Sequence, residues 1–108
     1  MVLLIYNLYI RFLYLGFQIK TGESMEKKLV GMVVHFYPKV SVAVVDVTDT
    51  LRVGDKITME RGTEIVEQVV AEMQIEHKKI QEAKKGESVG MKVFGKTKEG
   101  ARVFKVID

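Results

Sequence analysis

The chain has 108 residues, and its net charge is only +3 because basic and acidic residues nearly balance. We expect one small domain, since so short a chain cannot bury two separate hydrophobic cores. The chain contains no cysteine, which excludes a disulfide framework, a thiolate metal site and a cysteine nucleophile. Charged residues make up 29% of the sequence, and the prevalence of Lys and Glu is typical of a heat-adapted protein, so we expect a cytoplasmic location.

The first 24 residues differ in composition from the rest of the chain. Five of the nine aromatic residues lie within the first seventeen positions, in an apolar run that Arg11 interrupts. Three interpretations remain open. The segment is a start-site artefact in the first interpretation, because Met25 begins a stretch typical of a native N-terminus. In the second it is a membrane anchor, in which burying Arg11 in the bilayer would cost about 2.5–3.5 kcal/mol of insertion free energy. In the third it is an extra element packed on the domain. We therefore divide the chain into an apolar N-terminal extension, residues 1–24, and a folded domain, residues 25–108.

From residue 28 onwards, β-branched and aromatic runs separated by turn residues predict strands. In chain order we expect strands at residues 29–37, 40–47, 57–60, 91–94 and 102–107. Glycine adopts positive φ easily and an aspartate side chain can bond the local backbone, so we assign structural turns to Gly54, Asp55, Gly86 and Gly90. The aromatic residues of this part of the chain are expected to fill the core: Phe36, Tyr37, Phe94 and Phe104.

Residues 63–85 allow two secondary structures. The spacing of Ile65, Val66, Val69, Val70 and Met73 is typical of an amphipathic helix, and the segment contains no Gly or Pro. Alternation of apolar and polar residues from position 69 to 76 is instead typical of a long strand. Taken alone, the segment favours a helix by propensity, whereas the topology of the neighbouring strands favours a strand.

The chain resembles the second domain of translation elongation factors, such as elongation factor Tu. The similarity is carried by Leu-Val-Gly-Met-Val at 29–33, by Thr-Leu-Arg-Val-Gly-Asp-Lys-Ile at 50–57, and by residues 73–77 and 83–93. It extends to stand-alone archaeal elongation factor-like proteins and to the C-terminal barrels of collagenase-like peptidases. The resemblance implies an all-β fold, a small closed six-stranded antiparallel β-barrel of the translation-protein type, with residues 63–85 in strands.

Candidate sites for chemistry are weak. Residues Gly90–Thr97 match the phosphate-loop pattern GxxxxGK[ST], but the spacer residues are strand formers and no helix is predicted after them, so we expect no nucleotide binding and no cofactor. His35 and His77 are the only histidines, and a metal site would require them to converge with a carboxylate, so we expect no metal. We assign no catalytic residues and expect that the protein is not an enzyme.

Basic residues are the remaining candidates for function. In elongation factors this barrel contacts tRNA or ribosomal RNA, so the resemblance implies a non-catalytic, RNA-binding barrel whose partner is RNA or a protein of the translation apparatus. Two alternatives stay open: a protein-interaction module that docks on an enzyme or ribosomal protein, and a membrane-tethered barrel held by residues 1–24. The candidate RNA-binding residues are Lys78, Lys79, Lys84, Lys85, Lys92, Lys96, Lys98 and Arg102.

Overall fold

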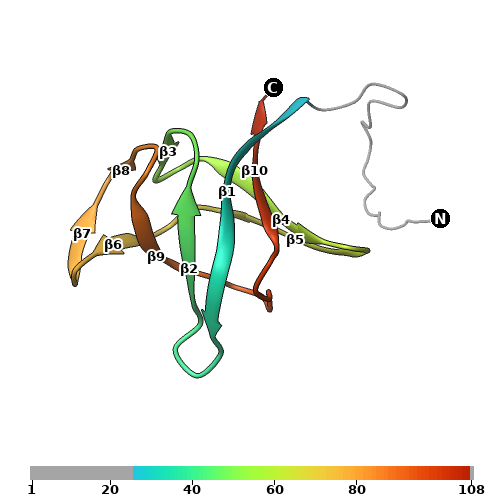
Figure 1. Cartoon of the computed structure of the whole chain (residues 1–108), viewed down its shortest axis with the longest axis horizontal. Helices are drawn as coiled ribbons and strands as arrows, with labels where there is room; N and C mark the ends of the chain where they lie inside the picture. The colour runs from blue at the N-terminus through green and yellow to red at the C-terminus, as the bar shows by residue number, and fades with distance from the viewer. Residues whose placement is uncertain (1–25, 108) are drawn as a thin grey trace.

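Every regular element among residues 26–107, the part of the chain that this computed structural model describes, is a β-strand (Figure 1). The all-β prediction is therefore confirmed. The strands are β1 (Glu26–Tyr37), β2 (Val42–Val47), β3 (Leu51–Arg52), β4 (Lys56–Arg61), β5 (Glu64–Val69), β6 (Met73–Ile75), β7 (Lys78–Ile80), β8 (Glu82–Ala83), β9 (Ser88–Lys92) and β10 (Arg102–Ile107).

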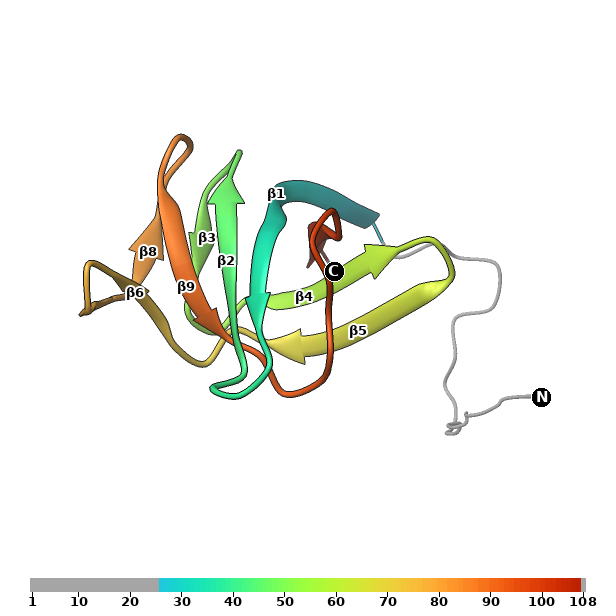
Figure 2. The ribbon, with the colours of Figure 1, turned by 60° about the horizontal axis from the view of Figure 1, so that its bottom comes forward.

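Eight of these strands form one antiparallel sheet in the order β5-β4-β10-β1-β2-β9-β6-β7, and β3 pairs with β8 in a second, two-stranded sheet. The larger sheet curls around the core, and the β4–β5 hairpin extends away from β2 and β9 (Figure 2). Its edge strands, β5 and β7, do not pair with each other. The predicted closed, six-stranded barrel is therefore wrong, because the strands among residues 26–107 are more numerous and their ladder stays open.

A side chain bridges part of the gap that the open ladder leaves. Gln68 of β5 donates a hydrogen bond of 2.9 Å from its Nε2 atom to the carbonyl of Lys92, and its Oε1 atom accepts one of 3.0 Å from the N–H of Phe94. These bonds join an edge of the sheet to the chain just after β9 without continuous backbone pairing. The side-chain amide of Gln68 thus links β5 to the end of β9 and the residues after it.

The curvature of the sheet originates in β1. This strand pairs with β10 along its first half and with β2 along its second, and its register shifts between Leu29 and Gly31 and between Val33 and His35. Such bulges bend and twist a strand. A Cβ atom on Gly31 would lie only 2.7 Å from the carbonyl oxygen of Asp46, so the absence of a side chain lets β1 and β2 approach closely.

The core is aliphatic. The predicted aromatic core is wrong for three of its four residues: Phe94 is 66% exposed, Tyr37 is 50% exposed and Phe104 is only half-buried, whereas the half-buried Phe36 packs against the core. Valine and methionine instead fill the narrow space between the curled strands. The buried apolar residues are Val30, Val33, Ala43, Val45, Val47, Leu51, Ile57, Met59, Val70, Met73, Ala83, Val89, Met91, Val93, Ala101 and Val103.

Residues 63–85 form four short strands, β5 to β8, and no helix. The break after β5 occurs where the backbone of Val70 pairs with the turn before β4: its N–H donates to the carbonyl of Asp55, and its carbonyl accepts from the N–H of Gly54, both at 2.8 Å. The buried Val70 side chain fixes this crossing. Tertiary packing thus overrides the helix-type spacing of the valines.

The predictions for residues 1–24 lie outside the described residues, and the domain boundary at residue 25 stays a prediction. Within residues 26–107 no helix exists that could cross a membrane. The predicted strands at 29–37, 40–47, 57–60 and 102–107 coincide closely with β1, β2, β4 and β10. The strand predicted at 91–94 is displaced, because β9 begins at Ser88 and ends at Lys92.

Candidate functional site

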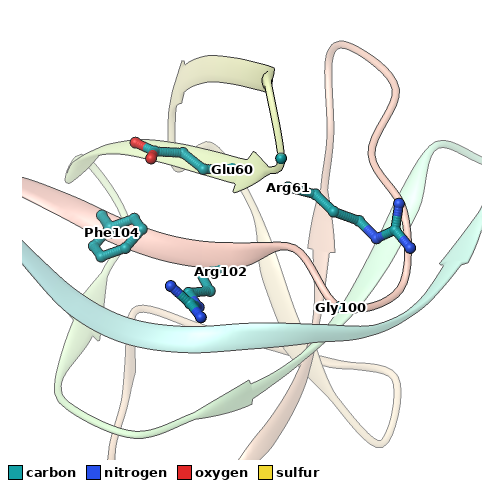
Figure 3. A pocket seen from close by; sticks show the side chains of 6 residues that line it. Glu60, Arg61, Gly100, Arg102 and Phe104 are labelled. Atoms are coloured by element: carbon teal, nitrogen blue, oxygen red, sulfur yellow. The ribbon is translucent and has the colours of Figure 1, made fainter.

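Three hollows of the described surface surround the β4–β5 hairpin and the loop of residues 93–101, which joins β9 to β10. One hollow of about 360 Å³, which we call the β10 groove, is lined by Glu60, Arg61, Gly62, Gly100, Arg102 and Phe104 (Figure 3). A second, of about 370 Å³, is lined by Phe36, Pro38, Arg61, Thr97, Lys98 and Glu99. A third, of about 320 Å³, which we call the edge groove, is lined by Glu64, Ile65, Val66, Lys96, Thr97 and Lys98.

Arg61 connects the first two hollows. It is the last residue of β4, and its side chain extends from the strand to the loop that holds Gly100 (Figure 3). The backbone of Gly100 has φ +91°, and a Cβ atom there would lie 3.5 Å from Nε of Arg61. The positive φ therefore favours glycine at this turn, while the distance to Arg61 is an ordinary van der Waals contact.

The loop of residues 93–101 is held firmly at both ends. Val93 and Ala101 are buried, the N–H of Val93 donates to the carbonyl of Ser41 at 2.8 Å, and the N–H of Gly100 donates to the carbonyl of Val33 at 2.8 Å. Thr97, between the two exposed lysines Lys96 and Lys98, is also buried. The lysines therefore project from a fixed backbone.

Glu60 is fully engaged within the β10 groove. Its Oε2 atom accepts a hydrogen bond of 2.7 Å from the hydroxyl of Thr58 and lies 2.6 Å from Nζ of Lys27, which also lies 5.1 Å from the ring centre of Phe104. The Lys27 ammonium, followed by the Thr58 hydroxyl, lowers the pKa of Glu60 below its usual value. A carboxylate held ionised in this way is a poor general acid.

The remaining charge of this region is positive. Among residues 26–107, no carboxylate lies within ion-pair distance of Arg61, Lys96, Lys98 or Arg102. The loop's own carboxylate, Glu99, is bound to Nδ1 of His35 at 2.9 Å. Both side chains of that pair are largely exposed, and no described hydroxyl hydrogen-bonds to the imidazole. The arrangement can bind an acidic group.

The predicted basic residues divide into two groups. Lys78 and Lys79 lie on β7, and Lys84 and Lys85 follow β8, on the opposite side of the molecule from the β4–β5 hairpin (Figure 1). Lys79 pairs with Glu72 at 3.2 Å. The second group, which lines the grooves, comprises Lys96, Lys98 and Arg102. Lys92, the last residue of β9, instead lines a separate hollow that also includes Val42 and Gln74. Sequence reasoning missed Arg61, although the Arg-Gly pair that ends a strand was visible.

The other residues singled out in the sequence have local roles. Gly54 and Gly86 have φ angles of +99° and +95°, and the carboxylate of Asp55 accepts a hydrogen bond of 2.8 Å from the N–H of Arg52. Gly90 lies inside β9, so its assignment to a turn is wrong. His77 lies in the β6–β7 turn, whereas His35 lies on β1 and Glu99 in the loop before β10. No cluster of three potential metal ligands occurs within residues 26–107.

Comparison with solved structures identifies the architecture. The chain superposes on the C-terminal domain of a Geobacillus thermoleovorans protein assigned to the U32 peptidases, with a TM-score of 0.69 and 20% identity, over 74% of this chain and 93% of that domain. The selenomethionine variant of the same domain gives a TM-score of 0.66, also at 20% identity, over 70% and 96%. The fold is that of a U32 peptidase C-terminal domain.

A sequence relative points in the same direction. The chain is 43% identical over 90 residues to an uncharacterized protease of Methanocaldococcus jannaschii, a match that covers 82% of this chain and 22% of the relative. The chain therefore spans about a fifth of the length of that protein. No protein-family model matches the chain.

These relatives correct the functional interpretation. Of the families named from the sequence, the collagenase-like peptidases are matched by these relatives, and the assignment to the elongation factors is not supported. The predicted translation-type, RNA-binding function is wrong, because the relatives are named as a protease and a U32 peptidase domain. The roles assigned to individual lysines, the RNA or translation partner and the cytoplasmic location are untested predictions.

Proposed function

We propose that this chain is a non-catalytic accessory domain of the U32 peptidase type, which holds another part of a peptidase assembly and does not itself cleave peptide bonds. The observation that carries this proposal is the 43% identity to a segment that makes up 22% of a protease. The likeness of the fold to a C-terminal peptidase domain supports the same role.

The chemistry of the grooves agrees with binding. Arg61 and Arg102 line the β10 groove, whose carboxylate Glu60 already bonds Lys27 and Thr58. Two unneutralised guanidinium groups are suited to an acidic surface of a neighbouring domain, because guanidinium binds carboxylates in a fixed, planar geometry. The Thr58 hydroxyl donates to Glu60, but Thr58 is buried and Lys27 pairs with the same carboxylate oxygen, so these two groups are poorly suited to act as a nucleophile and its base.

The test measures cleavage and binding separately. The purified full chain is incubated with fluorescein-labelled casein, and we expect no release of label above the blank. The chain is then titrated calorimetrically against the M. jannaschii protease from which the 90 matched residues have been removed, and we expect saturable binding. Casein cleavage that co-purifies with the chain would contradict the non-catalytic role, and absence of binding would contradict the accessory role.

Variants assign the binding surface. Replacing Arg61 and Arg102 by alanine is expected to weaken the calorimetric binding at least tenfold, because both side chains line the β10 groove. The matched control is Lys84→Ala with Lys85→Ala, which removes the same charge from the other side of the molecule and should leave binding unchanged. Equal losses from both pairs would contradict a role for the β10 groove.

A further inference from the structure

β5 is an edge strand of the eight-stranded sheet, and among residues 26–107 it pairs only with β4. The backbone of Val70, immediately after β5, bonds Gly54 and Asp55 on the β4 side. Because antiparallel pairing alternates along a strand, the N–H and C=O groups of Ile65, Glu67 and Val69 point away from β4. The edge thus presents a row of backbone donors and acceptors; of these, the Val69 carbonyl accepts a long, 3.4 Å bond from Gln68.

The two edges of the sheet differ in protection. β7 has three residues, two of which are exposed lysines, and short, lysine-bearing edges resist pairing with another chain. β5 has six residues and no lysine, and it exposes Ile65 (56%) and Val69 (49%). β5 is therefore the edge suited to accept an added strand.

The edge groove lies beside the first half of β5. Three consecutive residues of the strand, Glu64, Ile65 and Val66, line it together with residues 96–98. Successive side chains of a strand point to opposite faces, and a hollow at the strand's edge is within reach of three consecutive residues. Its volume of about 320 Å³ leaves room for part of another chain beside β5.

We propose that the edge groove binds an extended peptide segment, which pairs with β5 as an additional strand and directs acidic side chains at Lys96 and Lys98. Main-chain pairing would supply affinity, and the alternate side chains would supply specificity. This binding goes beyond the accessory role proposed above and does not depend on association with a peptidase.

Charge selects the acidic character of the segment. Lys96 and Lys98 are exposed, and no carboxylate among residues 26–107 pairs with them, whereas Glu64 is the single acidic residue of the groove's lining. On the other face of β5, Ile65, Glu67 and Val69 favour apolar and basic neighbours directly opposite. The expected ligand therefore alternates acidic residues with apolar or basic ones.

A second copy of this chain fits the edge poorly. Antiparallel pairing of β5 with itself through all three outward-facing residues would pair Ile65 with Val69 and would place Glu67 opposite Glu67. Like charges directly opposite each other in a sheet are destabilising. A different, acidic segment avoids this repulsion.

The test uses the full chain and a fluorescein-labelled probe, acetyl-Val-Glu-Lys-Glu-Val-amide, in a fluorescence anisotropy titration. The central lysine of the probe is designed to lie opposite Glu67, and its two glutamates to face Lys96 and Lys98. The charge-swapped peptide acetyl-Val-Lys-Glu-Lys-Val-amide is expected to bind at least tenfold more weakly. Equal binding of the two peptides would overturn the proposal.

Backbone pairing is tested on the probe, so that the protein stays unchanged. N-methylation of the central lysine removes an N–H that faces β5 and is expected to weaken binding at least tenfold. N-methylation of the first glutamate removes an N–H that points outward and is the matched control, expected to change binding less than threefold. Insensitivity to the first N-methyl group would overturn strand addition.

Protein variants locate the site. Lys96→Glu with Lys98→Glu is expected to weaken probe binding at least tenfold, while Lys78→Glu with Lys79→Glu, on the β7 edge, should leave it unchanged; circular dichroism checks that both variants fold. If sedimentation shows a dimer in which the amide of Glu67 is protected from hydrogen exchange without the probe, the edge belongs to a second copy and the proposal is overturned.

Discussion

The side chain of Gln68 on β5 accepts a hydrogen bond of 3.0 Å from the backbone N–H of Phe94, which follows β9, and so joins two segments that the sheet's ladder leaves apart. The same amide donates to the carbonyl of Lys92 at 2.9 Å. One half-buried side chain thereby satisfies two backbone groups where a closed barrel would use a further row of strand pairing.

Gln68→Ala is expected to lower the free energy of unfolding by about 1–2 kcal/mol, because two hydrogen bonds are lost and two backbone groups must find water. The melting temperature should fall by about 4–8 °C per kcal/mol in a domain of this size. Urea and thermal denaturation measure both quantities. Gln81→Ala is the control, since the exposed Gln81 side chain makes no hydrogen bond within the described residues; an equal loss there would contradict the bridging role.

Two strand glycines provide a matched pair. A Cβ atom on Gly31 would lie 2.7 Å from the backbone oxygen of Asp46, which cannot move without disturbing β2, whereas a Cβ on Gly90 would meet Cγ1 of Val42 at an ordinary 3.5 Å. We expect Gly31→Ala to destabilise the fold by about 1–3 kcal/mol and Gly90→Ala to be nearly neutral. Urea denaturation of both variants checks the order, and a larger loss for Gly90→Ala would contradict the close approach at β1.

The β6–β7 turn is strained. Glu76 and His77 occupy its two central positions with φ angles of +51° and +67°, a conformation that Asn-Gly adopts more readily. Replacing the pair by Asn-Gly is expected to raise the free energy of unfolding by about 1 kcal/mol. Gly86→Ala, at φ +95°, should do the opposite. A decrease in melting temperature for the Asn-Gly variant would show that the turn has another role.

The stability of the fold should depend on pH through Glu60. Its pKa is lowered in the folded protein, first by Lys27 and then by Thr58, so its contribution is present above the ordinary glutamate pKa and is lost as pH falls through the folded value. The stability advantage of the unaltered chain over Glu60→Gln should therefore shrink between neutral pH and pH ~3. Urea denaturation across this range measures it.

The pKa of Glu60 can also be measured directly. Carboxyl NMR of Glu60 should titrate below the usual glutamate range, and Lys27→Met should raise that pKa, because the ammonium group that favours the ionised form is removed. Lys28→Met is the control, since Lys28 pairs with Asp49 at 3.0 Å and not with Glu60. An unchanged Glu60 titration in Lys27→Met would contradict the assigned cause.

Strand positions were predictable where the residues themselves are decisive. Residues of high strand propensity are concentrated in β1, β2 and β10, and residues such as Gly54 and Gly86 mark turns because few other residues tolerate positive φ. Residues 63–85 were not predictable in this way, since their valines fit a helix and a strand equally well. The burial of Val70 and its pairing with the turn before β4 resolved that ambiguity.

The candidate site was harder to predict. Lys96, Lys98 and Arg102 were recognised as basic, but so were the lysines of β7 and β8, and charge along a sequence does not tell which cations share a surface. Arg61 was recognised as a candidate binding residue only from the fold, which places it between two hollows and next to Gly100. The predicted function was wrong because barrel-like turns and strands are shared by proteins of unrelated activity.

The residues by themselves determined most of the strands, the glycine turns and the absence of cysteine chemistry, since strand propensity, turn preference and composition are local properties. The all-β character of residues 63–85 was implied only by the resemblance to known barrels. Only the tertiary structure decided that the sheet stays open between β5 and β7, that Gln68 bridges to the chain after β9, and that the β5 edge faces Lys96 and Lys98 across a groove. These features depend on contacts between residues far apart in the chain, and their free energies arise only when the strands have curled around a shared core.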